Sequence, residues 1–312
     1  MAELVTLFGG GGFLGRYVAQ ELLRQGARVR VAERDPRKAW FLKPLGGLGQ
    51  TQFISVDITK KGSVDRAVAG ADAVVNLVGI LQGDFEASHV TGAHNVAEAA
   101  RRAGAKAMVH VSAIGADPES ESAYGRTKGE GERAVQAAFP DATIIRPSIL
   151  LGPEDQFINR FARMIQALPA VPIVRGDVKF QPAYVVDVAR AIAAAALDPG
   201  AHARKTYELG GPEVLSMTEI NQHIARMIGR DPAWLLVPDA AARAMARFGG
   251  WMPGAPITWD QWLMLQKDNV VSAGVKGFQA FGIAPSPLEA VAPEWLVQYR
   301  RNGRFGAVSD AA

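Results

Sequence analysis

The chain has 312 residues, of which 48% are hydrophobic and 21% charged, the proportions of an ordinary globular protein with one large or two modest domains. Its formal charge of +3 arises from lysines and arginines scattered among acidic residues, so we expect no nucleic acid partner. The absence of cysteine excludes disulfides, thiolate nucleophiles and cysteine-ligated metal centres, and it fits a reducing compartment.

Residues 4 to 26 have the pattern of a nucleotide-binding turn. A short apolar run typical of a doubly buried strand meets four glycines, and apolar residues at helical spacing then continue to Gly26. The glycines are compatible with GxxGxxG from Gly9 or with GxGxxG from Gly10, and a merely tight turn is the alternative to both. We predict that a dinucleotide lies against the backbone N–H groups at the start of the helix, bound by Gly9, Gly12, Phe13, Leu14 and Gly15.

Residues 28 to 34 alternate arginine with valine and predict a second strand. At the end of this strand an acidic residue accepts hydrogen bonds from the ribose of NAD, whereas an arginine pairs with the 2′-phosphate of NADP. Both types are present, as Glu33 and Arg34. Because Arg37 and Lys38 add positive charge, we favour NADP(H), with NAD(H) as the alternative. The third interpretation is that these charges only solvate a turn.

The chain then alternates between strand-like and helix-like segments. The pattern predicts strands at 51–56, 73–77 and 107–111 and helices at 64–69 and 87–103. This alternation indicates an α/β fold of the Rossmann type, with a doubly wound parallel sheet. Asp57, just after the third strand, either accepts a hydrogen bond from the adenine amino group or caps the next turn.

Three residues after the fifth strand predict chemistry. Ser112 follows the strand directly, and Tyr124 and Lys128 stand four residues apart at the start of a helix that runs to about Ala138. On one helical face, the ammonium group can stabilise a tyrosinate, lower the pKa of the phenol and reach the cofactor ribose. The alternative is a half-buried tyrosine with a solvated lysine.

Several segments together resemble a short-chain dehydrogenase of the extended or atypical kind. They are GGGGFLG, NLVG at 76–79, Ser112, YGRTK, RPSILLGPED at 146–155, FQPAYVVDVARAI at 180–192 and YELGGPEVLSMTEI at 207–220. More narrowly, VRVAERDP, PSILLGPEDQFINRFA and the tail at 265–296 resemble the short-chain-dehydrogenase-like accessory subunit of respiratory complex I and its bacterial relatives.

The resemblance implies cofactor contacts from Val78, Gly79, Lys128 and Pro147, and a catalytic set of Tyr124, Lys128 and Ser112. One departure concerns the serine. The extended dehydrogenases place it about two dozen residues before the tyrosine, whereas Ser112 stands only 12 residues before Tyr124. An alignment on the strand end puts Ile114 at the catalytic position.

After Pro147 the simple alternation ends, with predicted helices at 156–168, 185–197 and 217–228 and a strand at 206–209. We assign residues 1–150 to a dinucleotide-binding core. Residues 151–312 are assigned to a mixed segment that completes the sheet and forms a smaller substrate or partner subdomain. A substrate pocket is expected at the carboxyl ends of the later strands.

Residues 232–266 are rich in tryptophan and methionine, which suits a lid, a subdomain core, or a partner or membrane-surface patch. They include Trp234, Met245, Trp251, Met252, Trp259, Trp262 and Met264 around Pro253 and Pro256. Within them, residues 239–248 predict a short amphipathic helix. Its cations are Arg243 and Arg247, and its apolar face is formed by Ala241, Met245 and Phe248.

Two classes of function follow. The first is an accessory subunit bound to other respiratory complex subunits, cytoplasmic and peripheral on the inner face of the inner membrane. The second is a free NAD(P)-dependent oxidoreductase or epimerase acting on a carbonyl or alcohol. We expect no cleaved signal, because the first strand is not preceded by a charged leader with an apolar stretch of about 7 to 15 residues. We also expect no membrane span, because no apolar stretch approaches the roughly 20 residues that a bilayer requires. No histidine has metal-ligand spacing, so we predict no metal.

Overall fold

A seven-stranded parallel sheet forms the centre of the fold in the computed structural model, which describes residues 3–250 and 257–305. Its strand order is β11-β6-β5-β4-β1-β2-β3, and every neighbouring pair is parallel. The strands are β1 (Leu4–Phe8), β2 (Arg28–Glu33), β3 (Thr51–Ser55), β4 (Ala73–Asn76), β5 (Ala107–Val111), β6 (Thr143–Pro147) and β11 (Thr206–Leu209). This order confirms the predicted Rossmann-type doubly wound sheet.

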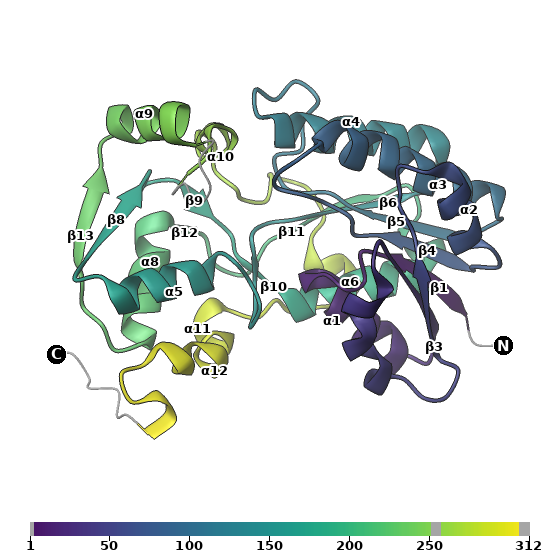
Figure 1. Cartoon of the computed structure of the whole chain (residues 1–312), viewed down its shortest axis with the longest axis horizontal. Helices are drawn as coiled ribbons and strands as arrows, with labels where there is room; N and C mark the ends of the chain where they lie inside the picture. The colour runs from purple at the N-terminus through teal and green to yellow at the C-terminus, as the bar shows by residue number, and fades with distance from the viewer. Residues whose placement is uncertain (1–2, 251–256, 306–312) are drawn as a thin grey trace. The chain divides into compact units, whose positions relative to one another are not determined.

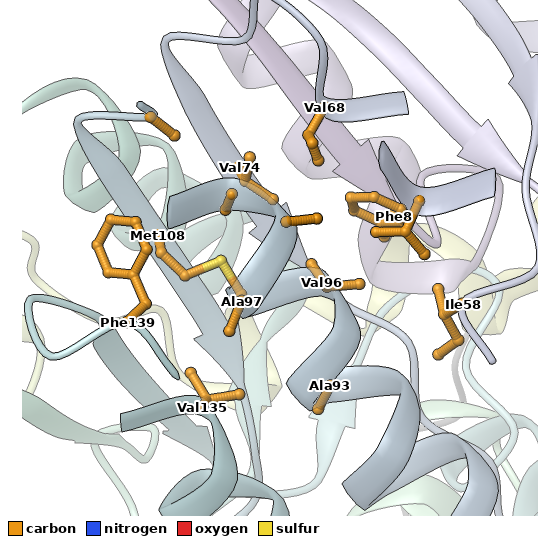
Figure 2. Packing of buried hydrophobic residues seen from close by; sticks show 14 of the residues in the cluster. Phe8, Ile58, Val68, Val74, Ala93, Val96, Ala97, Met108, Val135 and Phe139 are labelled. Carbon is orange, nitrogen blue, oxygen red and sulfur yellow. The ribbon is translucent and has the colours of Figure 1, made fainter. Parts of the chain in front are cut away.

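Helices cover both faces of this sheet (Figure 1). One face carries α2 (Lys61–Val68), α3 (Gly92–Arg102) and α4 (Ala123–Ala138), and the other carries α1 (Phe13–Arg24) and α6 (Val185–Leu197). Figure 2 shows the core beneath the first face, where Phe8, Met108 and Val96 pack together. Because both faces are covered, β1 and β5 are buried along their whole length, which explains why their sequences are largely apolar.

The predicted helix at 87–103 differs in one respect from the observed structure. A turn of π-helix, η2 (Glu86–Thr91), precedes α3. The hydrogen bonds in such a turn connect residues five apart instead of four, and apolar periodicity in the sequence does not reveal this change. A 3-10 run, η1 (Pro36–Leu45), was not predicted. It begins with a proline at its first position and contains Pro44, which disfavours a regular α-helix.

The chain folds into two compact units that interleave along the sequence. The first contains the sheet and consists of Met1–Pro147, Val185–Leu209 and Ser272–Ala284. It also includes α7 (Pro199–His202) and η3 (Phe278–Phe281). The later segments return to the sheet because β11 pairs with β6 and α6 packs under β4 and β5.

The second unit consists of Ser148–Tyr184, Gly210–Val271 and Pro285–Ala312. Its strands form three pairs: β7 (Leu150–Leu151) with β10 (Ala183–Tyr184), β9 (Lys179–Phe180) with β12 (Leu215–Ser216), and β8 (Ala170–Val174) with β13 (Ala233–Val237). Its helices are α5 (Ile158–Ala167), α8 (Met217–Met227), α9 (Asp239–Gly249), α10 (Trp259–Met264), α11 (Leu288–Val291), α12 (Pro293–Leu296), η4 (Val297–Tyr299) and η5 (Gly303–Phe305). No helix in the described part of the chain is long and apolar enough to cross a membrane.

The segment rich in tryptophan and methionine contributes β13, α9 and α10. Trp262 packs in a small cluster with Ala242, Ala246 and Ile257, so part of the segment is core. The predicted amphipathic helix is present as α9. The predictions for Trp251, Met252, Pro253 and Pro256 lie outside the described residues.

Helix α4 approaches its neighbours through glycines. A Cβ atom on Gly129 would lie 2.5 Å from the Pro118 ring, and a Cβ atom on Gly131 would lie 2.2 Å from the carbonyl oxygen of His89. The second contact joins α4 to the backbone of η2, which cannot swing aside as a side chain can. The position of α4 therefore depends on the absence of side chains on this face.

We predict that Gly131→Ala lowers the free energy of unfolding by about 1–3 kcal/mol, because the new methyl group forces α4 away from η2. The matched control is Gly62→Ala in α2, where a Cβ atom meets nothing within 4 Å. This substitution should raise the free energy of unfolding by about 0.5–1 kcal/mol, since alanine favours the helix. Urea titration measures both, and equal effects would contradict the close contact.

Candidate functional site

The glycine turn after β1 has the geometry of a phosphate-binding turn. Gly9 has a φ of +80°, a conformation that side chains disfavour. The Gly12 amide donates to the Gly9 carbonyl at 3.1 Å, and a Cβ atom on Gly15 would lie 2.2 Å from the same oxygen. The turn therefore falls to Gly9 and the helix packing to Gly15, which favours the GxxGxxG register.

The N-terminus of α1 suits an anion. Gly12 is the N-cap residue and has no side chain to accept from the first N–H groups, and the first helical turn contains no acidic residue. Phe13 and Leu14 begin the helix, so the positive end of the helix dipole meets the glycine turn. These residues fit the pyrophosphate of a dinucleotide.

The acidic and basic candidates at the end of β2 are in different situations. The Gly11 N–H donates to Glu33 Oε1 at 2.6 Å, and burial raises the pKa of the Glu33 carboxyl. Arg34 is exposed, and its side chain has no hydrogen bond or ion pair within residues 3–250 and 257–305. Arg37 pairs with Asp35 at 2.8 Å. The expected cationic cluster is thereby reduced to Arg34 and Lys38.

Asp57 caps a turn, which is one of its two expected roles. Its Oδ1 accepts from the amide of Thr59 at 3.0 Å and from the hydroxyl of Thr59 at 2.7 Å, so it caps the turn after β3. These hydrogen bonds lower the pKa of the Asp57 carboxyl.

The loop after β4 brings several predicted residues together. A Cβ atom on Gly9 would lie 3.4 Å from the Val78 amide nitrogen, so this loop contacts the glycine turn. A Cβ atom on Gly79 would lie 4.0 Å from Lys128 Nζ. On the other side of β5, the Pro147 carbonyl accepts from the Ile114 amide at 3.0 Å. The glycine turn, the NLVG loop and Lys128 therefore form one site.

Lys128 is buried, with 3% of its surface exposed. Its Nζ donates to the Val111 carbonyl at 2.8 Å, and burial lowers the pKa of its ammonium group to about 8. Burial raises the pKa of the Tyr124 phenol to about 12. The expectation that Lys128 lowers the pKa of this phenol is therefore wrong for this arrangement, because the ammonium donates to β5 and desolvation dominates at Tyr124.

Sequence reasoning missed His89, which adjoins both residues of the pair. Its ring stacks on Phe85 at a centroid distance of 5.4 Å and meets Tyr124 edge-on at 5.5 Å. The Ile80 amide donates to His89 Nε2 at 3.0 Å, so the ring proton is assigned to Nδ1. Nδ1 then donates to Thr127 Oγ1 at 3.0 Å. Burial, and secondarily the Lys128 charge, lower the pKa of His89 to about 4. No spacing rule reveals His89, because packing of η2 on α4 creates the contact.

Two buried polar atoms beside Lys128 have no hydrogen-bond partner in the described part of the chain. They are Ser112 Oγ and His110 Nε2. His110 Nδ1 lies 3.3 Å from Asn76 Nδ2, and burial lowers the pKa of His110 well below its usual value. An orphaned buried hydroxyl is rare in proteins and fits a bound polar group at this position. The described residues contain no group of three or more potential metal ligands.

Comparison with known proteins identifies the family. The NAD dependent epimerase/dehydratase family matches residues 5–210, which contain the glycine turn, the NLVG loop and the Tyr124–Lys128 pair. The chain belongs to this family. Nicotinamide dinucleotides are therefore its cofactor class, in agreement with the glycine turn.

The chain is also similar to named relatives over most of its length. The mitochondrial protein NADH dehydrogenase (ubiquinone) 1 alpha subcomplex subunit 9 of Arabidopsis thaliana is 36% identical, over 97% of this chain and 80% of that protein. The protein of the same name from Rattus norvegicus is 35% identical, over 95% of this chain and 80% of that protein. An NADPH-dependent quinone oxidoreductase of Escherichia coli, solved with NADPH, has the same fold, with a TM-score of 0.75, 20% identity, and coverage of 94% of this chain and 99% of that one.

We predict that Lys128→Met raises the free energy of unfolding at pH 7 by about 1–3 kcal/mol. The pKa of Lys128 is about 8 in the folded chain and near 10.5 in the unfolded one, so the buried charge is destabilising at neutral pH. The gain should be complete below pH 8 and should vanish above pH 10.5, because the unfolded chain binds the extra proton between these values. Denaturant titrations at several pH values measure it, and a loss of stability at pH 7 would contradict a strained buried ammonium.

Proposed function

We propose that this chain binds NADP(H) at the glycine turn and acts as a nucleotide-stabilised accessory subunit of a respiratory NADH dehydrogenase. The observation that carries the proposal is the state of the Tyr124–Lys128 pair within an otherwise complete dinucleotide site. Lys128 donates to the Val111 carbonyl, and burial raises the pKa of Tyr124 to about 12. A cofactor can be bound by this site without the tyrosine being prepared for proton transfer.

The preference for NADP(H) rests on the end of β2. Glu33 Oε1 accepts from the Gly11 N–H within the glycine turn, so one of its two carboxylate oxygens is already bonded to the protein and only the other is left for a ribose hydroxyl. Arg34 is exposed beside it, and Lys38 follows in η1. An exposed guanidinium group suits a 2′-phosphate, to which it can donate two parallel hydrogen bonds.

The remaining contacts follow from the position of each residue. The glycine turn, with Phe13 and Leu14, would hold the pyrophosphate, and Lys128 would reach the nicotinamide ribose from α4. Val78, Gly79 and Pro147 would line the route between them, and Asp57 would lie at the adenine end. Bound nucleotide would stabilise the fold by roughly 2.7 kcal/mol at a hundredfold excess over its dissociation constant.

The alternative function is a free oxidoreductase or epimerase acting on a carbonyl or alcohol. The observation that favours it is Ser112, whose buried Oγ has no partner among the described residues and could polarise a carbonyl oxygen. The dinucleotide would supply or accept the hydride. Tyr124 would donate or accept the proton, and Lys128 would have to turn from Val111 towards the phenol.

The relatives support assembly with respiratory subunits, because two of them are named as subunits of NADH dehydrogenase. We place the chain on the cytoplasmic side, peripheral on the inner face of the inner membrane. Helix α9 offers one contact, since Met245 and Phe248 are 40% and 77% exposed and Arg243 is also exposed. Arg247 stacks on Trp259 at 5.2 Å. Two cations add only about 1 kcal/mol each at an anionic surface, so protein contacts would provide most of the attachment.

We predict that the chain binds NADPH more tightly than NADH and that Arg34→Ala removes a preference of roughly ten- to a hundredfold, the value of a charge-assisted hydrogen bond. Calorimetric titration measures both affinities. The matched control is Arg37→Ala, because Arg37 is also exposed and adjacent but is paired with Asp35. Equal or tighter NADH binding in the unaltered chain would instead assign the adenosine ribose to Glu33.

We predict that the tagged chain, extracted from its native membranes in gentle detergent, is recovered with subunits of respiratory NADH dehydrogenase. Gly12→Asp should weaken both nucleotide binding and this assembly, since a carboxylate at the turn repels the pyrophosphate. Gly62→Asp is the control, because Gly62 has open space around it. Phe248→Ser should reduce retention of the chain on salt-washed membranes while nucleotide binding is kept.

Two results would contradict the accessory-subunit proposal. One is recovery of the chain without any respiratory-chain subunit. The other is sustained NADPH oxidation with a defined carbonyl compound that is lost in Tyr124→Phe, which would favour the oxidoreductase.

A further inference from the structure

Lys128 carries a buried charge without a carboxylate in direct contact, and the structure shows where its counter-charge lies. Four titratable groups face it. Tyr124 and Glu132 lie on α4, His89 comes from η2, and His110 from β5. Burial keeps both histidines neutral at pH 7, and burial raises the pKa of Tyr124 to about 12, so the tyrosine is neutral as well. Glu132 is therefore the only charged group of the four.

Glu132 stands one helical turn after Lys128 on the same buried face of α4, with 5% of its surface exposed. Arg146 on β6 holds both of its carboxylate oxygens, from Nε to Oε1 at 2.9 Å and from Nη2 to Oε2 at 2.6 Å. A bidentate pair of this kind fixes the rotamer of the carboxylate as well as its charge.

Arg146 also contacts a second buried carboxylate. Its Nη1 lies 3.4 Å from Glu208 Oε1 on β11. The other oxygen of Glu208 accepts from the Ser272 amide at 2.7 Å. The network thus ties α4, β6, β11 and the returning segment together inside the first unit.

The charges of this network balance only when Lys128 is included. Glu132 and Glu208 supply two negative charges, whereas Arg146 supplies one positive charge. The protonated Lys128 brings the net charge of the set to zero. A balanced set costs less to bury than an uncompensated charge, so the negative excess favours the charged form of Lys128.

We propose that Glu132, held by Arg146 and Glu208, is a positioning residue that keeps the Lys128 ammonium charged and directed at the nucleotide site. This inference rests on the proposed function, in which Lys128 binds the cofactor ribose. It adds that nucleotide binding is sensitive to pH. The pH range of binding is set by Glu132, a carboxylate that does not itself contact the cofactor.

The test measures the NADPH affinity of the unaltered chain and of the Glu132→Gln variant by fluorescence titration from pH 6.5 to 9. Removing the negative charge lowers the pKa of Lys128 from about 8, so the ammonium is lost at a lower pH. If the pKa falls by about one unit, affinity relative to the unaltered chain is roughly fivefold weaker at pH 8 and nearly unchanged at pH 6.5. Glu132→Asp, which keeps the charge, should recover most of the affinity at pH 8.

The matched control is Glu130→Gln, on the same helix but half-exposed and without a hydrogen bond or ion pair within the described residues. It should leave the pH profile unchanged. A purely structural role for Glu132 would lower affinity by the same factor at every pH, and this result would overturn the proposal.

A second measurement does not depend on the nucleotide. The difference in free energy of unfolding between each chain and its Lys128→Met variant rises with pH from the folded pKa of Lys128 upwards. In Glu132→Gln this rise should begin at a lower pH than in the unaltered chain, and an unchanged onset would overturn the proposal. If the unaltered chain binds no NADPH at any pH, the proposed function fails while this onset still decides the role of Glu132.

Discussion

The burial of one ammonium group constrains much of this structure. The Lys128 ammonium group is buried between α4 and β5. It is stabilised there by its hydrogen bond to the Val111 carbonyl and by the negative charge of Glu132 one turn away. The same helix must approach η2 and the loop after β5 closely enough to exclude water, which the glycines at 129 and 131 permit. Close packing and charge burial therefore depend on each other, since wider spacing would hydrate the ammonium and restore its ordinary pKa.

The site brings together a glycine turn suited to a dinucleotide and a tyrosine whose phenol has a raised pKa. The glycine turn and the uncapped helix start suit the pyrophosphate of a dinucleotide. Tyr124 instead packs edge-on against Phe85 and His89, in surroundings that raise the pKa of its phenol. Binding and turnover make different physical demands, and a member of an enzyme family can meet the first without the second.

Most of the first unit could be predicted from local pattern, whereas the three strand pairs of the second unit were not predicted. Largely apolar runs identified β1 and β5, because strands covered on both faces have no polar side to alternate with. The glycine turn could be recognised because strand, turn and helix follow one another directly in the chain. The π-helical turn in η2 and the 3-10 run in η1 were missed, since apolar spacing does not distinguish these variants from an α-helix or a loop.

The sequence by itself determined the parallel sheet and the family, and it predicted the residues of the nucleotide site, because each depends on neighbours in the chain. Only the tertiary structure decided their chemical states. It placed Glu33 on the Gly11 N–H, turned Lys128 towards Val111 and brought His89 against Tyr124. It also joined Glu132 to Arg146 and Glu208, which come from three separate elements. A pKa depends on burial and on charges contributed by distant segments, and neither can be read from local spacing.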